Sequence, residues 1–135
     1  MAKFIATDYN ITINGTSFSS SLAAVTLDIT VEEQDTTSFG STARTRIGGL
    51  KDASISLDFH QDFGASSVDT TIFPLLGSNA TVVIKPTSST VSATNPTYTA
   101  VALVTQYQPF ANSVGDLATL SLSWPITGAI TRATA

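Results

Sequence analysis

The residues with the clearest potential for chemistry surround the only histidine of the chain. His60 lies two positions from Asp58 and two from Asp62, so in an extended strand the three side chains share one face. Two neighbouring carboxylates favour the charged form of an imidazole. The spacing would suit a catalytic dyad, but we favour a polar row that faces solvent or a lumen, because no other motif completes an active site.

Motifs of common active and cofactor sites are absent from the sequence. It has no GxSxG, no Walker loop, no HExxH, no GxGxxG after a strand and no EF-hand loop. No cysteine and one histidine argue against disulfides and against a zinc site. Asn10, Asn14 and Asn79 each begin an Asn-x-Thr triplet, which chance explains in so Thr-rich a chain without a secretion signal. We therefore expect no enzyme, no metal and no cofactor.

Length and charge limit the function further. The 135 residues are enough for one domain, 1–135, with a real core. Net charge is −4, and the six basic residues are scattered singly. This pattern argues against a domain that grips nucleic acid, which needs clustered Lys and Arg, but not against a surface past which nucleic acid slides. No apolar run is long enough to span a membrane, and the N-terminus does not read as a signal peptide.

Hydroxyl side chains, not charges, occupy the polar positions. Only 12% of the residues are charged, about half the usual fraction of roughly 25%. A sheet protein normally places charge, especially Lys, on its edges to prevent edge-to-edge pairing, yet the only lysines are Lys3, Lys51 and Lys85. Either this is a Thr-rich β-sandwich with a neutral surface, or it is a subunit whose surface is mostly covered by other subunits.

Alternation of apolar and polar residues predicts strands over 8–16, 24–31, 53–63, 79–86, 98–107 and 117–124. Asn14-Gly15 predicts a tight turn. We expect Pro125 to end the last strand and residues 126–135 to form a C-terminal tail.

A change of period between Gly64 and Gly77 predicts one short helix. The apolar stripe is Val68, Ile72, Leu75 and Leu76. Ser66 or Ser67 can cap its start, and Pro74 should kink or end it. The predicted fold is mainly β: an antiparallel β-sandwich or partly closed barrel with one short flanking α-helix and a long inter-strand arm.

The two clearest strands each have an apolar and a polar face. We expect the apolar set to face the core, because a slip of one residue would expose all of it. That set is Val25, Leu27, Ile29, Ile55, Leu57 and Phe59. The opposite face carries Thr26, Asp28, Thr30, Ser56, Asp58 and His60.

Residues 33–49, between these strands, show no apolar periodicity. Phe39 and Ile47 are the only large apolar residues in this segment, and Gly48-Gly49 suggests a flexible break. Structureless loops of this length are usually functional or disordered. The segment is therefore either a mobile surface loop or an extended arm that docks on a neighbouring subunit.

A family resemblance rests on the order of several stretches. GLKDASISLD at 49–58 is followed by Gln61-Asp62, by Val68-Asp69 and by FPLLG at 73–77. VVIKP at 82–86 and LSWPITG at 122–128 follow later. In this order they resemble the tail tube (major tail) proteins of long non-contractile-tailed bacteriophages, and the resemblance covers most of the chain.

The resemblance implies a structural virion protein. Such proteins form hexameric rings that stack into a tube, around a lumen through which double-stranded DNA passes without specific binding. The implied partners are further copies of the chain and other tail proteins (tape measure, terminator, distal tail). The implied location is the virion tail, after assembly in the host cytoplasm, with no enzymatic role, metal or membrane.

The resemblance also suggests roles for two sets of residues. The arm would reach the adjacent ring through Glu33, Asp35, Phe39, Arg44 and Arg46. We expect Arg44 or Arg46 to pair with carboxylates of that ring. The polar face named above would line the lumen if its strands form the inner barrel, and otherwise it is the outer, solvated surface.

Two other classes remain open from the sequence. A capsid decoration or head–tail connector protein can also be a small β-rich domain. A carbohydrate-binding β-sandwich needs clustered exposed aromatics, whereas Trp124 falls on the apolar face of its strand and the tyrosines are spread along the chain.

Overall fold

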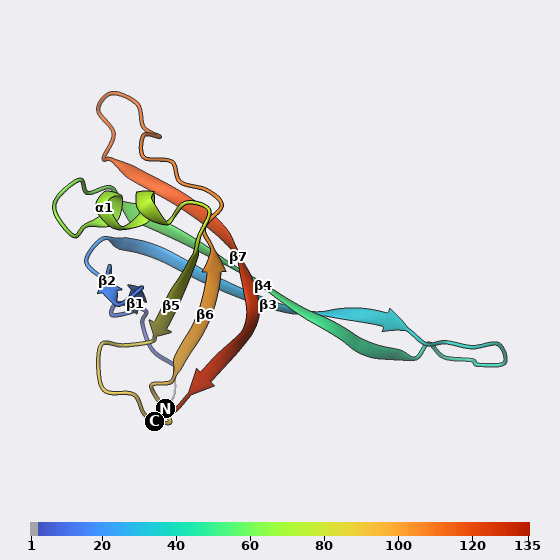
Figure 1. The fold of residues 1–135 in the computed structure, drawn as a ribbon. Helices are drawn as coiled ribbons and strands as arrows, with labels where there is room; N and C mark the ends of the chain where they lie inside the picture. Colours follow the sequence, from blue (N-terminus) through green and yellow to red (C-terminus); the bar gives the residue numbers. More distant parts are fainter. Residues whose placement is uncertain (1–2) are drawn as a thin grey trace.

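One antiparallel sheet of seven strands, in the order β2-β1-β5-β6-β7-β4-β3, dominates the computed structural model, which describes residues 3–135. Residues 1 and 2 of the predicted domain lie outside the described part. The strands are β1 (Asn10–Ile13), β2 (Thr16–Ser17), β3 (Leu22–Asp35), β4 (Arg46–His60), β5 (Asn79–Lys85), β6 (Thr97–Leu103) and β7 (Thr119–Ala133). A helix, α1 (Val68–Ile72), and a 3₁₀ turn, η1 (Phe73–Leu75), lie between β4 and β5. Figure 1 shows the sheet curling, with the β3–β4 hairpin projecting far from the body.

The sheet folds over on itself because β7 changes partner along its length. Residues 119–125 of β7 pair with β4, and residues 126–133 pair with β6. Within residues 3–135 the edge strands β2 and β3 do not pair with each other, so the sheet is not closed into a barrel. The predicted mainly β, antiparallel fold with one short helix is confirmed in its sandwich-like form.

Pro125 does not end the last strand, so the prediction of a trailing tail at 126–135 is wrong. β7 continues to Ala133, which pairs with Thr97 of β6. Pro125 lies opposite Ser54, at the last pair between β7 and β4. Because proline has no N–H to donate to a ladder, it fits where β7 leaves one neighbour for the other.

One core lies between the two layers and under α1. Alternation places Ile55, Leu57 and Phe59 inward from β4, each no more than 1% exposed. Their β7 partners Trp124, Leu122 and Leu120 are buried with them. Burial of each such side chain is worth about 1.5–3 kcal/mol. The buried Trp124 indole donates from Nε1 to the Gln106 carbonyl at 2.9 Å, so it retains a hydrogen bond.

The apolar face of β3 is less covered than its sequence predicts. Val25 and Leu27 are only partly buried against the core, and Ile29 is 48% exposed. The register still places them on the core side, since Val25 pairs with Leu57 and Leu27 with Ile55. β3 is an edge strand at the open side of the sandwich, so its outer end lies beyond the core.

Local signals in the sequence account for the first hairpin and the helix. Asn14 and Gly15 have φ of 51° and 86°, which suits the predicted tight turn between β1 and β2. The hydroxyls of Ser67 and Thr70 form a capping box at the start of α1. The α-helix ends at Ile72, and Pro74 falls in η1, as expected for a residue that removes a backbone donor.

The predicted helical stripe is confirmed in part. Val68 and Ile72 are fully buried and Leu75 packs against the core, but Leu76 is exposed. A 3₁₀ turn has three residues per turn, so the last residue of the stripe rotates off the buried side.

Candidate assembly site

The arm between β3 and β4 is largely an ordered β-hairpin. The ladder continues outward through Glu33–Gly48, Gln34–Ile47 and Asp35–Arg46, leaving only residues 36–45 as a loop. The sequence predicted strands only over 24–31 and 53–63 in this region, whereas β3 and β4 extend the pairing as far as Asp35 and Arg46. Both faces of this hairpin are exposed, so no alternation of apolar and polar residues marks its strands.

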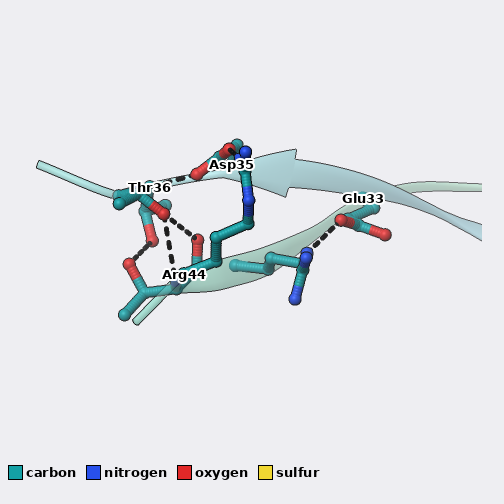
Figure 2. Close-up of polar contacts among 7 residues, drawn as sticks. Glu33, Asp35, Thr36 and Arg44 are labelled. Carbon is teal, nitrogen blue, oxygen red and sulfur yellow. Dashed lines mark hydrogen bonds and ion pairs between the residues drawn. The ribbon is translucent and has the colours of Figure 1, made fainter. Parts of the chain in front are cut away.

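Two ion pairs cross this hairpin. Arg44 Nη1 lies 3.0 Å from Asp35 Oδ2, and Arg46 pairs with Glu33 through its Nε (Figure 2). Both arginines thus have carboxylate partners in their own chain, whereas we expected partners in the next ring. All four side chains are at least half exposed, and such pairs are worth only about 0–1 kcal/mol each.

Threonines hold the loop end of the hairpin together. The backbone N–H of Thr36 donates to the Thr45 carbonyl at 2.8 Å, and their hydroxyls lie 2.8 Å apart (Figure 2). The Thr45 N–H donates to the Thr37 hydroxyl, and the Thr37 N–H donates to Asp35 Oδ1. The Thr37 bonds lower the pKa of Asp35, and Arg44 lowers it further. The arm is thus shaped by polar contacts within a single chain.

Gly48 and Gly49 lie inside β4, so they are not the predicted flexible break. They face a register shift in β3 between Val31 and Glu33. A Cβ on Gly48 would lie 3.2 Å from Val31 Cγ1, and one on Gly49 would lie 3.3 Å from the Glu32 carbonyl. The two glycines therefore allow the strands to approach closely at this bulge.

The outer part of the β3–β4 hairpin carries exposed apolar side chains. Phe39 is fully exposed in the loop, and Ile47 and Leu50 are also mostly exposed. These are the apolar groups of the hairpin that a partner could cover.

The predicted polar face exists and is wider than the sequence suggested. Thr26, Asp28, Thr30, Ser56, Asp58 and His60 are all exposed. Cross-strand pairing unites them, with Thr26 opposite Ser56. β7 extends the face, because Ser123 pairs with Ser56, Ser121 with Asp58 and Thr119 with His60. We missed these three residues, although the inward alternation of Leu120, Leu122 and Trp124 implies them.

The His60 cluster is only partly assembled. Asp58 and His60 are on β4, but Asp62 lies beyond its end and accepts a hydrogen bond from the Gly64 N–H at 2.8 Å. Over residues 3–135 no group of three or more His, Cys, Asp or Glu could hold a metal ion. In the same part of the chain no helix is long and apolar enough to cross a membrane.

An apolar groove of about 360 Å³ lies at the open side of the sandwich. It is lined by Phe4, Tyr9, Val25, Leu27, Ile29, Ile84, Lys85, Pro86 and Tyr98. These residues come from the N-terminal segment, β3, the end of β5 and the start of β6. A neighbouring hollow of about 440 Å³ shares Ile29 and Tyr98 with it and includes Arg132.

Two loops meet at the other end of β6. The rings of Phe63 and Phe110 stack with centroids 5.6 Å apart, although Phe63 is 52% and Phe110 83% exposed. Tyr107 anchors the second loop, since its hydroxyl donates to Asp69 Oδ1 at 2.6 Å. Gln61 Nε2 donates to that hydroxyl at 3.2 Å and to the Pro109 carbonyl at 2.9 Å.

Comparison with known proteins finds the same fold in solved structures. No protein-family model and no curated protein sequence matches the chain. A chain in the virion of a native gene transfer agent particle is 19% identical, with a TM-score of 0.74 over 93% of this chain and 95% of that one. A chain in the tail of an empty gene transfer agent particle, computed with helical refinement and C6 symmetry, is 20% identical, with a TM-score of 0.67 over 85% and 83%. At such identities the likeness shows a shared fold.

Proposed function

We propose that this protein is the structural subunit of a phage-like tail tube, in which hexameric rings stack around a lumen that conducts DNA. The observation that carries the proposal is the fold shared over 85% of the chain with a component of a C6-symmetric tail. In this role the chain binds copies of itself and other tail proteins in the virion, and it performs no catalysis.

The edge of β3 supports self-assembly. Its segment 24–31 contains no Lys or Pro, and Asp28 is its only charged residue, so it has few of the residues that usually protect an exposed edge from pairing. The other edge of the sheet, β2, is only two residues long. An unprotected long edge is tolerable when a neighbouring subunit supplies a strand, so we place ring contacts along β3.

The arm supports stacking. It projects far from the body (Figure 1), and its internal hydrogen bonds set its shape before any partner binds. A preorganised arm loses less conformational entropy on docking than a disordered one. We place Glu33, Asp35, Phe39, Arg44 and Arg46 at contacts with the adjacent ring, with Phe39 as the apolar contact and the two arginines stabilising the hairpin.

The polar face supports DNA passage. It carries Asp28 and Asp58 among hydroxyls, and the face residues named above include no Lys or Arg. A negatively charged wall attracts no phosphate and offers no fixed cation to hold one. We assign this face to the lumen.

Electron microscopy and analytical ultracentrifugation of the purified protein over a wide concentration range test the proposal. We expect rings or tubes with sixfold symmetry. Monomers at every concentration, together with a virion tail that lacks the protein, would contradict the tube function and would favour a capsid decoration or connector role.

Deletion of residues 36–45 isolates the contribution of the arm. We expect the shortened chain to fold, because the loop packs on nothing in the core, and to form rings that do not stack. Tubes of normal length from this variant would show that the arm is only a loop.

A further inference from the structure

The two ends of the sandwich differ in both shape and charge. One end, where β4 and β6 finish and β7 begins, exposes Phe63, Phe110, Val114 and Leu117. We call these four residues the cap. The two loops that carry the cap, 61–67 and 104–118, contain the carboxylates of Asp62 and Asp116 and no Lys or Arg.

The opposite end is a basic apolar groove. The groove is lined by the end of β5 and the start of β6, so the length of β6 separates it from the cap. Lys85 lines it, Lys3 adjoins Phe4 in the sequence, and Arg132 lines the neighbouring hollow. Lys85 Nζ donates to the Ser89 carbonyl and Arg132 Nε to the Tyr98 hydroxyl, both of which are neutral acceptors.

Charge therefore divides along the molecule. Lys85 lines the groove, and Lys51 and Arg132 line the neighbouring hollow. Asp52 also lines the hollow, and Asp8 accepts hydrogen bonds from Ser88, next to the Ser89 carbonyl that Lys85 contacts. With Lys3, the four cations at this end outnumber its two carboxylates. A convex, apolar, acidic surface at one end and a concave, apolar, basic surface at the other are complementary, and one chain supplies both.

We propose that the cap of one subunit docks in the groove of a second copy of the chain, as a contact between neighbours within a ring that lies beside the β3 edge. Contact between two different surfaces of the same chain is head-to-tail, and head-to-tail contacts generate rings when the rotation closes. In Figure 1 the arm points across the direction that runs from the loop 104–118, at the top, to the C-terminus, at the bottom. The arm can then reach an adjacent ring while the cap contacts a neighbour in its own ring. This inference rests on the proposed tube function and adds the pair of surfaces that closes the ring.

Substitution of Phe110 tests the cap. Phe110→Ser should raise the protein concentration needed for ring formation roughly tenfold or more, because a phenylalanine would no longer be buried in the contact. The matched control is Phe73→Ser, which removes a similarly exposed phenylalanine outside the cap and should leave ring formation unchanged. Circular dichroism should show both variants folded.

The charge prediction is tested separately. Lys85→Glu places a carboxylate in the groove and should weaken ring formation, and higher salt should weaken wild-type rings as it screens the attraction.

Cross-linking identifies the partners directly, because the chain has no native cysteine. Val114→Cys mixed with Ser89→Cys should give a dimer with a short bismaleimide linker. Val114→Cys mixed with Ser121→Cys, on the polar face, should not. Wild-type rings with no Val114–Ser89 product, or undiminished rings from Phe110→Ser, would overturn the inference and leave the tube function standing. Failure of the wild type to form rings would overturn both.

Discussion

At the scale of single residues, Tyr107 links two separate parts of the fold. Its hydroxyl joins α1, through Asp69, to the loop that carries Phe110. Burial raises the pKa of Tyr107 to about 12, and the Asp69 carboxylate adds to the rise. The interaction therefore needs the protonated phenol.

Tyr107→Phe removes the hydrogen bonds with Asp69 and Gln61 and should lower the free energy of unfolding by about 1–2 kcal/mol. The wild type should also lose stability as pH rises from 10 towards the folded pKa of about 12, since the unfolded chain then releases a proton that the folded chain retains. Urea denaturation at neutral and alkaline pH measures both effects. The phenylalanine variant should show a smaller alkaline loss, and an equal loss in both proteins would contradict this account.

At the scale of elements, the β3–β4 hairpin shows how polar contacts order a segment that has no core. Asp35 is central, because it accepts from the Thr37 N–H and pairs with Arg44. The lowered pKa of Asp35 means that its contribution is fully present above the unfolded pKa of about 3.9 and is lost as pH falls through the folded value.

Acidification should therefore open the loop end of the hairpin while the sandwich stays folded. NMR chemical shifts of the Thr37 and Thr45 amides, followed from neutral pH to about pH 2.5, would report the opening. Asp35→Asn provides the control, since its amides should already resemble the acid state at neutral pH. Shifts that stay constant through the titration would count against a role for Asp35.

At the scale of the whole molecule, the proposed lumen assignment depends on which sheet face turns inward. The face of β3, β4 and β7 is rich in hydroxyls and contains two carboxylates, Asp28 and Asp58. Repeated in every ring, these charges would give a negative channel whose low-dielectric walls focus the field.

The double variant Asp28→Lys/Asp58→Lys should assemble nearly normally, because both side chains are exposed, yet particles that contain it should release DNA more slowly. Fluorescence of a DNA-binding dye outside the particles gives the release rate. Asp28→Asn/Asp58→Asn is the matched control and should release DNA at nearly the wild-type rate. Unchanged release from the lysine variant would falsify the lumen assignment.

The sequence by itself determined the features that depend on local chemistry. Alternation identified the inward faces of β4 and β7, Asn14-Gly15 the first turn, and the Ser67–Ile72 pattern the helix. These predictions succeed because a strand or helix that is buried on one side carries apolar residues at the positions that face the core.

Tertiary structure decided the rest. The strands of the arm are exposed on both faces, so their sequence shows no alternation of apolar and polar residues. Their length is therefore known only from the residue pairs between β3 and β4 in the structure. Pro125 lies inside β7 because the strand changes partner there, and partner choice depends on residues distant in the sequence. Ile29 is apolar yet exposed. Alternation of apolar and polar residues shows which side of the strand a residue faces, but it does not show how far the opposite layer of the sandwich extends to cover that residue. Phe63 and Phe110 meet only because two loops far apart in the chain end at the same edge of the sandwich.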